Sequence, residues 1–352
     1  MRKLSIVLAL VGLLLGTVLI GWFGFGPVLA AVGSVGWGQF ALIIGWQFVL
    51  FVVLGLAWEA ITPGREFRRL LVLIWGRMVR DASANCLPFS QVGAFVFGAR
   101  AVTLHGISWS LATASTVVDV TAEFLAEVAF TAIGLAILLA RAPQSSLAVP
   151  VEVGLGLAVV AGVALVWLQQ SATPLFATIG GRLASRWFRN SEDHSQVLQA
   201  ELSLIYGHAG RLAMGFSLHL LGWLGTGVAG FITYRAVGVP IEFDDALAIE
   251  ALLSAAAALA FLVPVNAGVQ EAGYAGLGAI FGVPPELSLG VSLVRRARDI
   301  AVGVPVLLIW QAFEARRLRG VERAEPGGRP AGRPPPPNPL PQGEGEKYLD
   351  IS

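Results

Sequence analysis

The sequence contains a single cysteine in 352 residues and has few charged side chains. Cys86 alone can form neither an intrachain disulfide nor a multi-cysteine metal site. Its expected role is that of a small buried apolar residue beside a helix break. Charged residues make up 13% of the chain and hydrophobic residues 55%, a balance that excludes a soluble fold of ordinary composition. The sequence therefore predicts a polytopic membrane protein.

Signatures of the common enzyme classes are also missing from the sequence. It has no H-E-x-x-H motif, no Gly-rich phosphate loop followed by Lys and no Ser-His-Asp arrangement. The histidines His105, His194, His208 and His219 lack companions at metal-ligand spacing. No metal site and no cofactor is therefore expected. A formal net charge of +1, without a basic patch interleaved with aromatics, argues against a nucleic-acid partner.

Long apolar runs dominate what is present. A bilayer-spanning helix needs about 20 apolar residues, and six runs come near that length: Leu4–Gly24, Phe40–Trp58, Ser110–Ala140, Val151–Leu168, Leu212–Tyr234 and Leu287–Trp310. Two further runs, Leu70–Phe97 and Leu247–Phe281, are broken by Pro88 and Pro264, and each predicts a re-entrant helical hairpin whose freed backbone groups face protein or a wet cavity. The expected fold is an all-α polytopic membrane protein with about six transmembrane helices and two re-entrant hairpins.

Each of the two broken runs begins a longer stretch, and the two stretches have glycine and charged residues at matching positions. Pro88 is followed by Gly106, Asp119 and Glu123, at distances of 18, 31 and 35 residues. Pro264 is followed at the same distances by Gly282, Arg295 and Asp299. Broken apolar segments at corresponding positions of two halves point to a transporter-like internal repeat with a binding site near the bilayer midplane. We expect the first repeat at 70–140 and the second at 247–311.

Asp119, Glu123 and Glu127 recur every fourth residue, so they form one acidic stripe about 80° wide on a helix. An ionisable side chain at the centre of a membrane helix costs about 2.5–3.5 kcal/mol on insertion scales. The stripe should therefore face protein or water rather than lipid. Acid–base chemistry by these carboxylates and simple ion pairing are both open.

On the last apolar run, Arg295, Arg298 and Asp299 share one face. Arg295 and Asp299 are spaced to pair at i, i+4. Arg298 then has two possible partners: an acid of the first repeat, as a structural clamp across the repeat axis, or an anionic headgroup in a cavity.

Small and polar residues flank the two breaks. Asn85 and Asn266 can hydrogen-bond backbone groups freed at the breaks or contact a ligand. Gly93 and Gly268 follow the prolines, and Glu271 falls in the first turn of the half-helix expected after Pro264. There it either caps the helix or takes part in binding. The candidate lipid-binding residues are therefore those at the two breaks, the acidic stripe and the charged face of the last run: Asn85, Pro88, Gly93, Asp119, Glu123, Glu127, Pro264, Asn266, Gly268, Glu271, Arg295, Arg298 and Asp299.

Basic residues predict the orientation of the chain. By the positive-inside rule, both termini are expected in the cytoplasm. The cytoplasmic segments would carry Arg2 and Lys3; Arg65, Arg68 and Arg69; Arg182, Arg186, Arg189 and Arg211; and Arg316, Arg317, Arg319 and Arg323, against Arg141 and Arg235 on the opposite side. The two halves would then be related by inversion.

The chain outside the repeats has two more features. In the cytoplasmic linker, residues 171–211, Leu198, Leu202 and Ile205 recur at helical spacing and predict an amphipathic helix, either an interfacial linker or a partner-binding surface. Residues 319–352, rich in Pro and Gly, are expected to form a disordered tail after a transmembrane domain at 1–318.

Two motifs carry a family resemblance. Residues 85–93, N-C-L-P-F-S-Q-V-G, with Arg100 after them, and residues 264–271, P-V-N-A-G-V-Q-E, resemble the flippase-like superfamily named for the transmembrane region of lysylphosphatidylglycerol synthases. The first motif and Arg295–Asp299 most resemble its integral membrane proteins associated with hopanoid biosynthesis. Other members often carry Glu where this chain has Ala94.

The resemblance implies a bacterial inner-membrane protein that handles or translocates an amphiphilic lipid, such as a hopanoid or an anionic phospholipid. Two alternatives stay open. One is a membrane-embedded lipid-modifying enzyme, although no nucleophile or acid–base pair stands out. The other is a non-catalytic assembly partner of lipid-synthesis enzymes that acts through the linker.

Overall fold

The computed structural model describes residues 33–64, 66–87, 91–146, 148–171, 191–259 and 268–324. Within these ranges every regular element is helical, and no strand occurs. The predicted all-α class is thus confirmed. The expected first span, Leu4–Gly24, lies outside the described residues, as do Pro88, Pro264 and Asn266.

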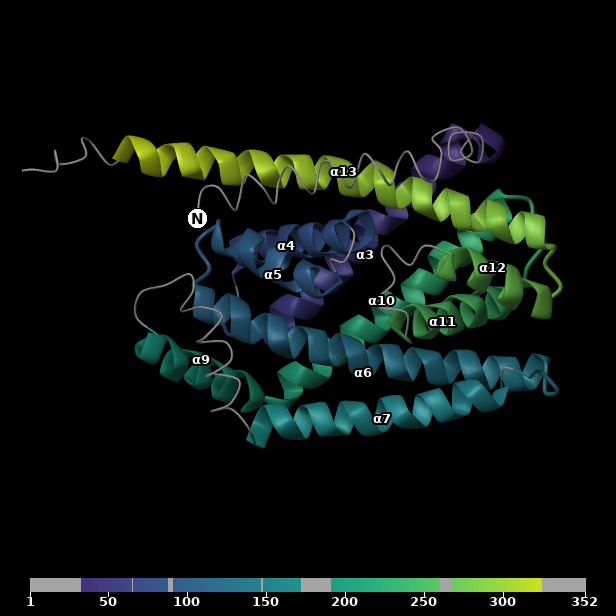
Figure 1. Ribbon diagram of the computed structural model, residues 1–352, viewed down its shortest axis with the longest axis horizontal. Coiled ribbons are helices and arrows are strands. Elements are labelled where there is room, and N and C mark those ends of the chain that lie inside the picture. The colour runs from purple at the N-terminus through teal and green to yellow at the C-terminus, as the bar shows by residue number, and fades with distance from the viewer. Residues whose placement is uncertain are drawn as a thin grey trace, which may run out of the picture. The chain divides into compact units, whose positions relative to one another are not determined.

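Two runs of four helices contain the two matched stretches. The first run is α3 (Trp37–Ile61), α4 (Phe67–Cys86), α5 (Gln91–Thr103) and α6 (Trp109–Arg141). The second is α10 (Ala209–Ala236), α11 (Phe243–Leu259), α12 (Val269–Ile280) and α13 (Pro285–Ala324). Between them lie α7 (Ala148–Ser171) and α9 (Ser191–Tyr206). Figure 1 shows α4 with α5 and α11 with α12 lying toward opposite ends of α6.

The helix boundaries extend the match seen in the sequence. Phe67 and Phe243, which begin α4 and α11, stand equally far before Pro88 and Pro264. Trp109 and Pro285, which begin α6 and α13, stand equally far after them. The turns before these long helices both use a glycine with positive φ, 96° at Gly106 and 76° at Gly282.

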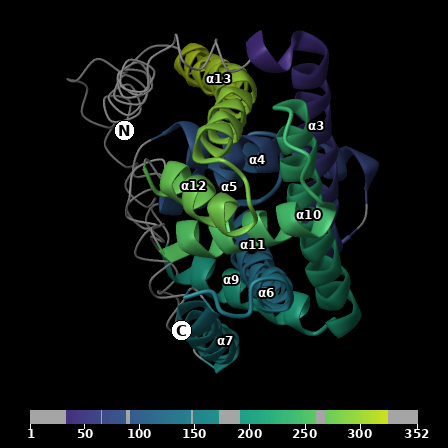
Figure 2. The ribbon, with the colours of Figure 1, turned by 90° about the vertical axis from the view of Figure 1, so that its right-hand side faces the viewer.

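Three of the described helices, α3, α6 and α10, are long and apolar enough to cross a membrane. Helices α3 and α10 pack side by side (Figure 2). Glycines make this approach close, because a side chain at Gly222 or Gly225 would collide with Leu54 or Leu50 of α3. Small residues at such contacts let membrane helices gain dispersion energy along their length.

Helix α6 is surrounded on several sides. It packs against α10 and α11 and also carries α7 along its length. The outer face of α7 exposes the apolar side chains of Val153, Leu157, Val160 and Trp167. Such a stripe suits contact with lipid tails rather than water.

The amphipathic helix expected in the linker is present as α9. Leu202 and Ile205 are buried against Ile61, Ala114 and Val118, with Leu198 packed beside them. Its apolar face therefore packs on α3 and α6.

The chain divides into two units, residues 1–313 and 314–352. Helix α13 continues to Ala324, past the point where the sequence predicts the tail to begin. Residues 325–352 lie outside the described ranges.

Candidate functional site

A cavity of 490 Å³ lies within the 1–313 unit, where the two runs of helices meet. Its described lining comes from α3, α4, α5, α6, α10, α11, α12 and α13. Four arginines line it: Arg77, Arg80, Arg295 and Arg298. Four carboxylates line it as well: Asp81, Glu123, Glu127 and Asp299. The acidic stripe of α6 and the charged face of α13 thus meet in one cavity.

One charge cluster joins α4 to α6. Arg77 and Arg80, at i, i+3, present two guanidinium groups on the same face of α4. Arg77 donates from both Nη atoms to the two carboxylate oxygens of Glu123, one of these bonds being 2.9 Å long. Arg80 donates to Asp119 Oδ2 at 2.9 Å and also to Glu123. Arg77 Nε lies 3.0 Å from Asp81 Oδ1, one turn along α4. Glu123 therefore holds two arginines at once.

Side chains from other helices complete this cluster. His219 of α10 is fully buried, and its Nε2 lies 2.8 Å from Asp119 Oδ1. Trp223, one turn further along α10, donates from Nε1 to the backbone carbonyl of Glu123 at 3.3 Å. The Arg80 guanidinium stacks 4.4 Å above the ring of Phe95 in α5, a cation–π contact. The cluster thus fixes α4, α5, α6 and α10 relative to one another.

Another charge cluster joins α11, α12 and α13. Arg295 forms an ion pair with the buried Glu250 of α11 and donates to the Tyr274 hydroxyl at 2.8 Å. Tyr274 in turn donates to Glu250 Oε1. In both runs of helices, then, a charge on the helix before the break, α4 or α11, binds the opposite charge on the long helix that follows, α6 or α13. The signs are reversed: arginine lies on α4 but glutamate on α11.

These contacts revise the expected pairings. Arg295 binds Glu250 and Tyr274, whereas Asp299 accepts from Arg298 at 3.0 Å from Nε and 2.7 Å from Nη2. The clamp between Arg298 and the acidic stripe is absent among the described residues, because Arg77 and Arg80 already occupy Asp119 and Glu123.

The remaining predicted residues are distributed as follows. Asn85 lines the cavity together with the charged residues. Gly93, Gly268 and Glu271 lie outside its lining. Gly268 adopts a φ of 78° before α12, and its N–H donates to Glu271 Oε2 at 2.9 Å. Glu271 also binds Arg296 at 2.8 Å, so it caps α12 and ties it to α13.

Sequence reasoning missed Arg77, Arg80, Asp81, Glu250 and His219. The available signal was an ionisable residue inside an otherwise apolar run, which by itself marks a buried partner or a functional site. Glu250 stands in such a run, between Ile249 and Ala251. Arg77, Arg80 and Asp81 lie on one helical face of the run that ends at the first break.

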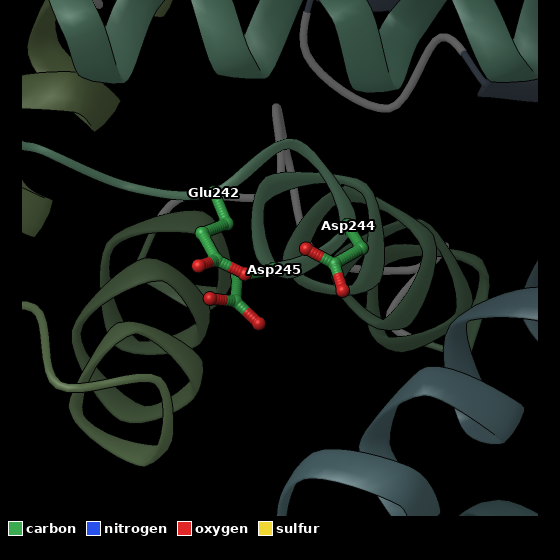
Figure 3. A group of neighbouring side chains, drawn as sticks. All are labelled: Glu242, Asp244 and Asp245. Carbon is green, nitrogen blue, oxygen red and sulfur yellow. The ribbon is translucent and has the colours of Figure 1, made fainter.

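A second acidic group lies outside the cavity, at the start of α11. Figure 3 shows Glu242, Asp244 and Asp245, whose ligand atoms lie within 4.8 Å of one another. Arg141, at the end of α6, bonds Glu242 and Asp244 and lies 3.6 Å from Asp245. The hydrogen bond from Arg141 lowers the pKa of Asp244, whereas burial raises the pKa of Asp245. Arg141 offsets one of the three negative charges and links the three carboxylates to α6, which accounts for the group as an ion-pair contact between α6 and α11.

Comparison with known proteins identifies the family. Residues 9–306 match the model of the family described as the lysylphosphatidylglycerol synthase transmembrane region. No curated protein and no solved structure matches the chain. The match contains every described residue that lines the cavity. The chain therefore belongs to the family of lysylphosphatidylglycerol synthase transmembrane regions, and it is a multi-pass membrane protein of lipid-related function.

Proposed function

We propose that this protein handles or translocates an amphiphilic lipid, with the polar headgroup in the cavity and the apolar part toward the surrounding hydrocarbon. The observation that carries the proposal is the charged cavity of 490 Å³, lined by helices of both four-helix runs. This volume falls within the range of about 300–1,000 Å³ typical of ligand pockets. Charged groups facing a cavity inside a membrane protein mark a substrate pathway more often than a structural core.

The lining fits a headgroup with oxygen-rich or phosphate chemistry. Guanidinium groups recognise phosphate and carboxylate oxygens through paired N–H bonds. Arg298 has only the neighbouring Asp299 as its partner within the described part of the cavity. Asn85 and Gln270 add amide groups to the same lining. An anionic phospholipid, or a hopanoid with a polar side chain, is the proposed lipid.

The proposed arrangement in the membrane follows the repeat. The helix pairs α4–α5 and α11–α12 would be re-entrant hairpins, entered from opposite faces of a bacterial inner membrane, with both termini in the cytoplasm. Including Leu4–Gly24, about six helices would span the bilayer within a domain at 1–318. Separate charge clusters support this arrangement, because each run of helices ties its own broken pair to the long helix that follows.

The test is lipid translocation by purified protein in vesicles of phosphatidylcholine and phosphatidylglycerol. The probe is fluorescent phosphatidylglycerol, whose outer-leaflet fraction is measured by dithionite quenching. Arg298→Gln should reduce translocation about tenfold or more, because a charge-assisted hydrogen bond worth about 1.5–3 kcal/mol is lost. Arg235→Gln is the matched control, because Arg235 lies outside the cavity lining. Equal rates for the two variants would contradict the assignment of the cavity.

A further inference from the structure

Glu127 differs from the other charged residues of the cavity. It lies on α6 one turn after Glu123 and lines the same cavity. Glu123 is saturated by Arg77 and Arg80. The Glu127 carboxylate, in contrast, makes no hydrogen bond or ion pair with any residue that the structure describes.

The arginines of the cavity already form ion pairs with other carboxylates. Its four arginines pair with five carboxylates: Asp81, Asp119, Glu123, Glu250 and Asp299. Four arginines and five carboxylates, counted without His219, leave one excess negative charge. An ionised Glu127 would add a second negative charge on a half-buried side chain of a membrane helix, where a charge without a partner is disfavoured. The lack of a counter-ion therefore favours the neutral carboxylic acid form of Glu127 over the carboxylate.

No neighbouring helix supplies a counter-ion within the described residues. Charged groups reach the cavity from α4, α6 and α13 only, while α3, α5, α10, α11 and α12 contribute uncharged lining residues. Helices α7 and α9 also pack against α6 but contribute nothing to the lining. His219 and Glu250 lie outside the cavity lining. His219 is bound to Asp119, and Glu250 is bound to Arg295.

We propose that Glu127 is a proton-binding site of the cavity, which carries a proton while the cavity is closed and releases it when the cavity opens to water. In the release step the O–H bond of the acid breaks, the proton passes to a water molecule and the carboxylate remains. Uptake on the opposite face of the membrane reverses the step. Carboxylates on membrane helices serve as proton carriers in many pumps and transporters. The link from this proton to lipid movement rests on the proposed function; the proton site itself does not.

Infrared spectroscopy tests the proton site without any transport. Purified protein in vesicles of phosphatidylcholine is titrated to alkaline pH, and the carbonyl band of protonated carboxylic acids is followed. Glu127→Gln should remove the acid band that titrates in the wild-type protein. Glu201→Gln, in α9, is the matched control and should retain it. An unchanged band in Glu127→Gln would overturn the proton site.

Transport across a pH gradient tests the coupling. Movement of fluorescent phosphatidylglycerol by the wild-type protein should speed up severalfold under one direction of the gradient and slow down under the other. Glu127→Gln should fold normally and lose this response. If wild-type translocation were absent but the infrared band behaved as expected, the proposed function would fail while the proton site stood. If the translocation rate of the wild-type protein did not depend on the pH gradient, the coupling would be overturned.

Discussion

Single residues decide how charge is accommodated in this protein, and Glu123 and Glu127 show the contrast. They lie one turn apart on the same face of α6 and line the same cavity. Glu123 bridges two buried arginines, whereas Glu127 has no charged partner among the described residues. Neighbouring identical side chains can therefore have different roles, one holding helices together and the other free to exchange a proton.

The two glutamates give a matched pair of variants. Glu123→Gln should destabilise the protein by about 3–5 kcal/mol, because it leaves Arg77 and Arg80 without their shared counter-charge. Glu127→Gln replaces a neutral acid with a neutral amide of the same shape, and its effect should stay below about 1 kcal/mol. Thermal unfolding in detergent, followed by circular dichroism, measures both. Equal shifts in melting temperature would contradict the assigned roles.

At the scale of elements, the turns that precede the long helices α6 and α13 depend on glycine. Gly106 and Gly282 have φ values of 96° and 76°, and an added Cβ atom at either position would meet no atom within 4 Å. The requirement is therefore backbone conformation alone, since residues with a Cβ atom are strained at positive φ.

Alanine substitution should expose this requirement equally at both turns. Gly106→Ala and Gly282→Ala should each destabilise the protein by about 1–2 kcal/mol. Gly154→Ala in α7, where space is also open but φ is not positive, is the control and should be neutral or slightly stabilising. Chemical denaturation in mixed micelles gives the comparison. A loss at Gly154 as large as at the two turns would rule out the conformational explanation.

The contact between the end of α6 and the start of α11 should respond to acid. Because the pKa of Asp244 is lowered by Arg141, its contribution is complete above the ordinary Asp pKa of about 3.9 and is lost as the pH falls through the lowered value. The pKa of Asp245 is raised in the folded protein. Its contribution to stability therefore changes in the opposite direction and increases as the pH falls.

Melting temperatures measured from about pH 5 to about pH 3 distinguish the contributions of Asp244 and Asp245 to stability. Asp244→Asn should lose less stability on acidification than the wild-type protein does. Asp245→Asn should lose more, because the opposing contribution is removed. The same acid dependence in both variants would show that Arg141 does not distinguish the two carboxylates.

At the scale of the whole molecule, the inverted arrangement makes a prediction about access. In a Cys86→Ser background, a cysteine at His105, beside the turn at Gly106, should react with a membrane-impermeant maleimide from the cytoplasmic side only. A cysteine at Pro284, beside the turn at Gly282, should react from the opposite side only, because the two repeats would be inverted. Labelling of intact cells and of inside-out vesicles gives both measurements. Reaction of the two positions from the same side would exclude inversion.

Composition and local pattern were enough to predict the membrane class, the helical runs, the two breaks and the matched turns. Each depends on neighbours within one run of the chain: apolar length, a proline, a glycine. The acidic stripe was predictable for the same reason, because the spacing of Asp119, Glu123 and Glu127 places them on one face of a helix.

What the sequence by itself determined is therefore which segments form helices and that the acidic stripe of α6 faces protein or water rather than lipid. Only the tertiary structure decided which charges pair. Arg77 and Glu123 lie 46 residues apart, and His219 and Asp119 lie 100 apart. Their meeting depends on the distance and rotation between packed helices, which no local spacing encodes. The same geometry left Glu127 without a partner, and so separated a structural glutamate from one available for chemistry.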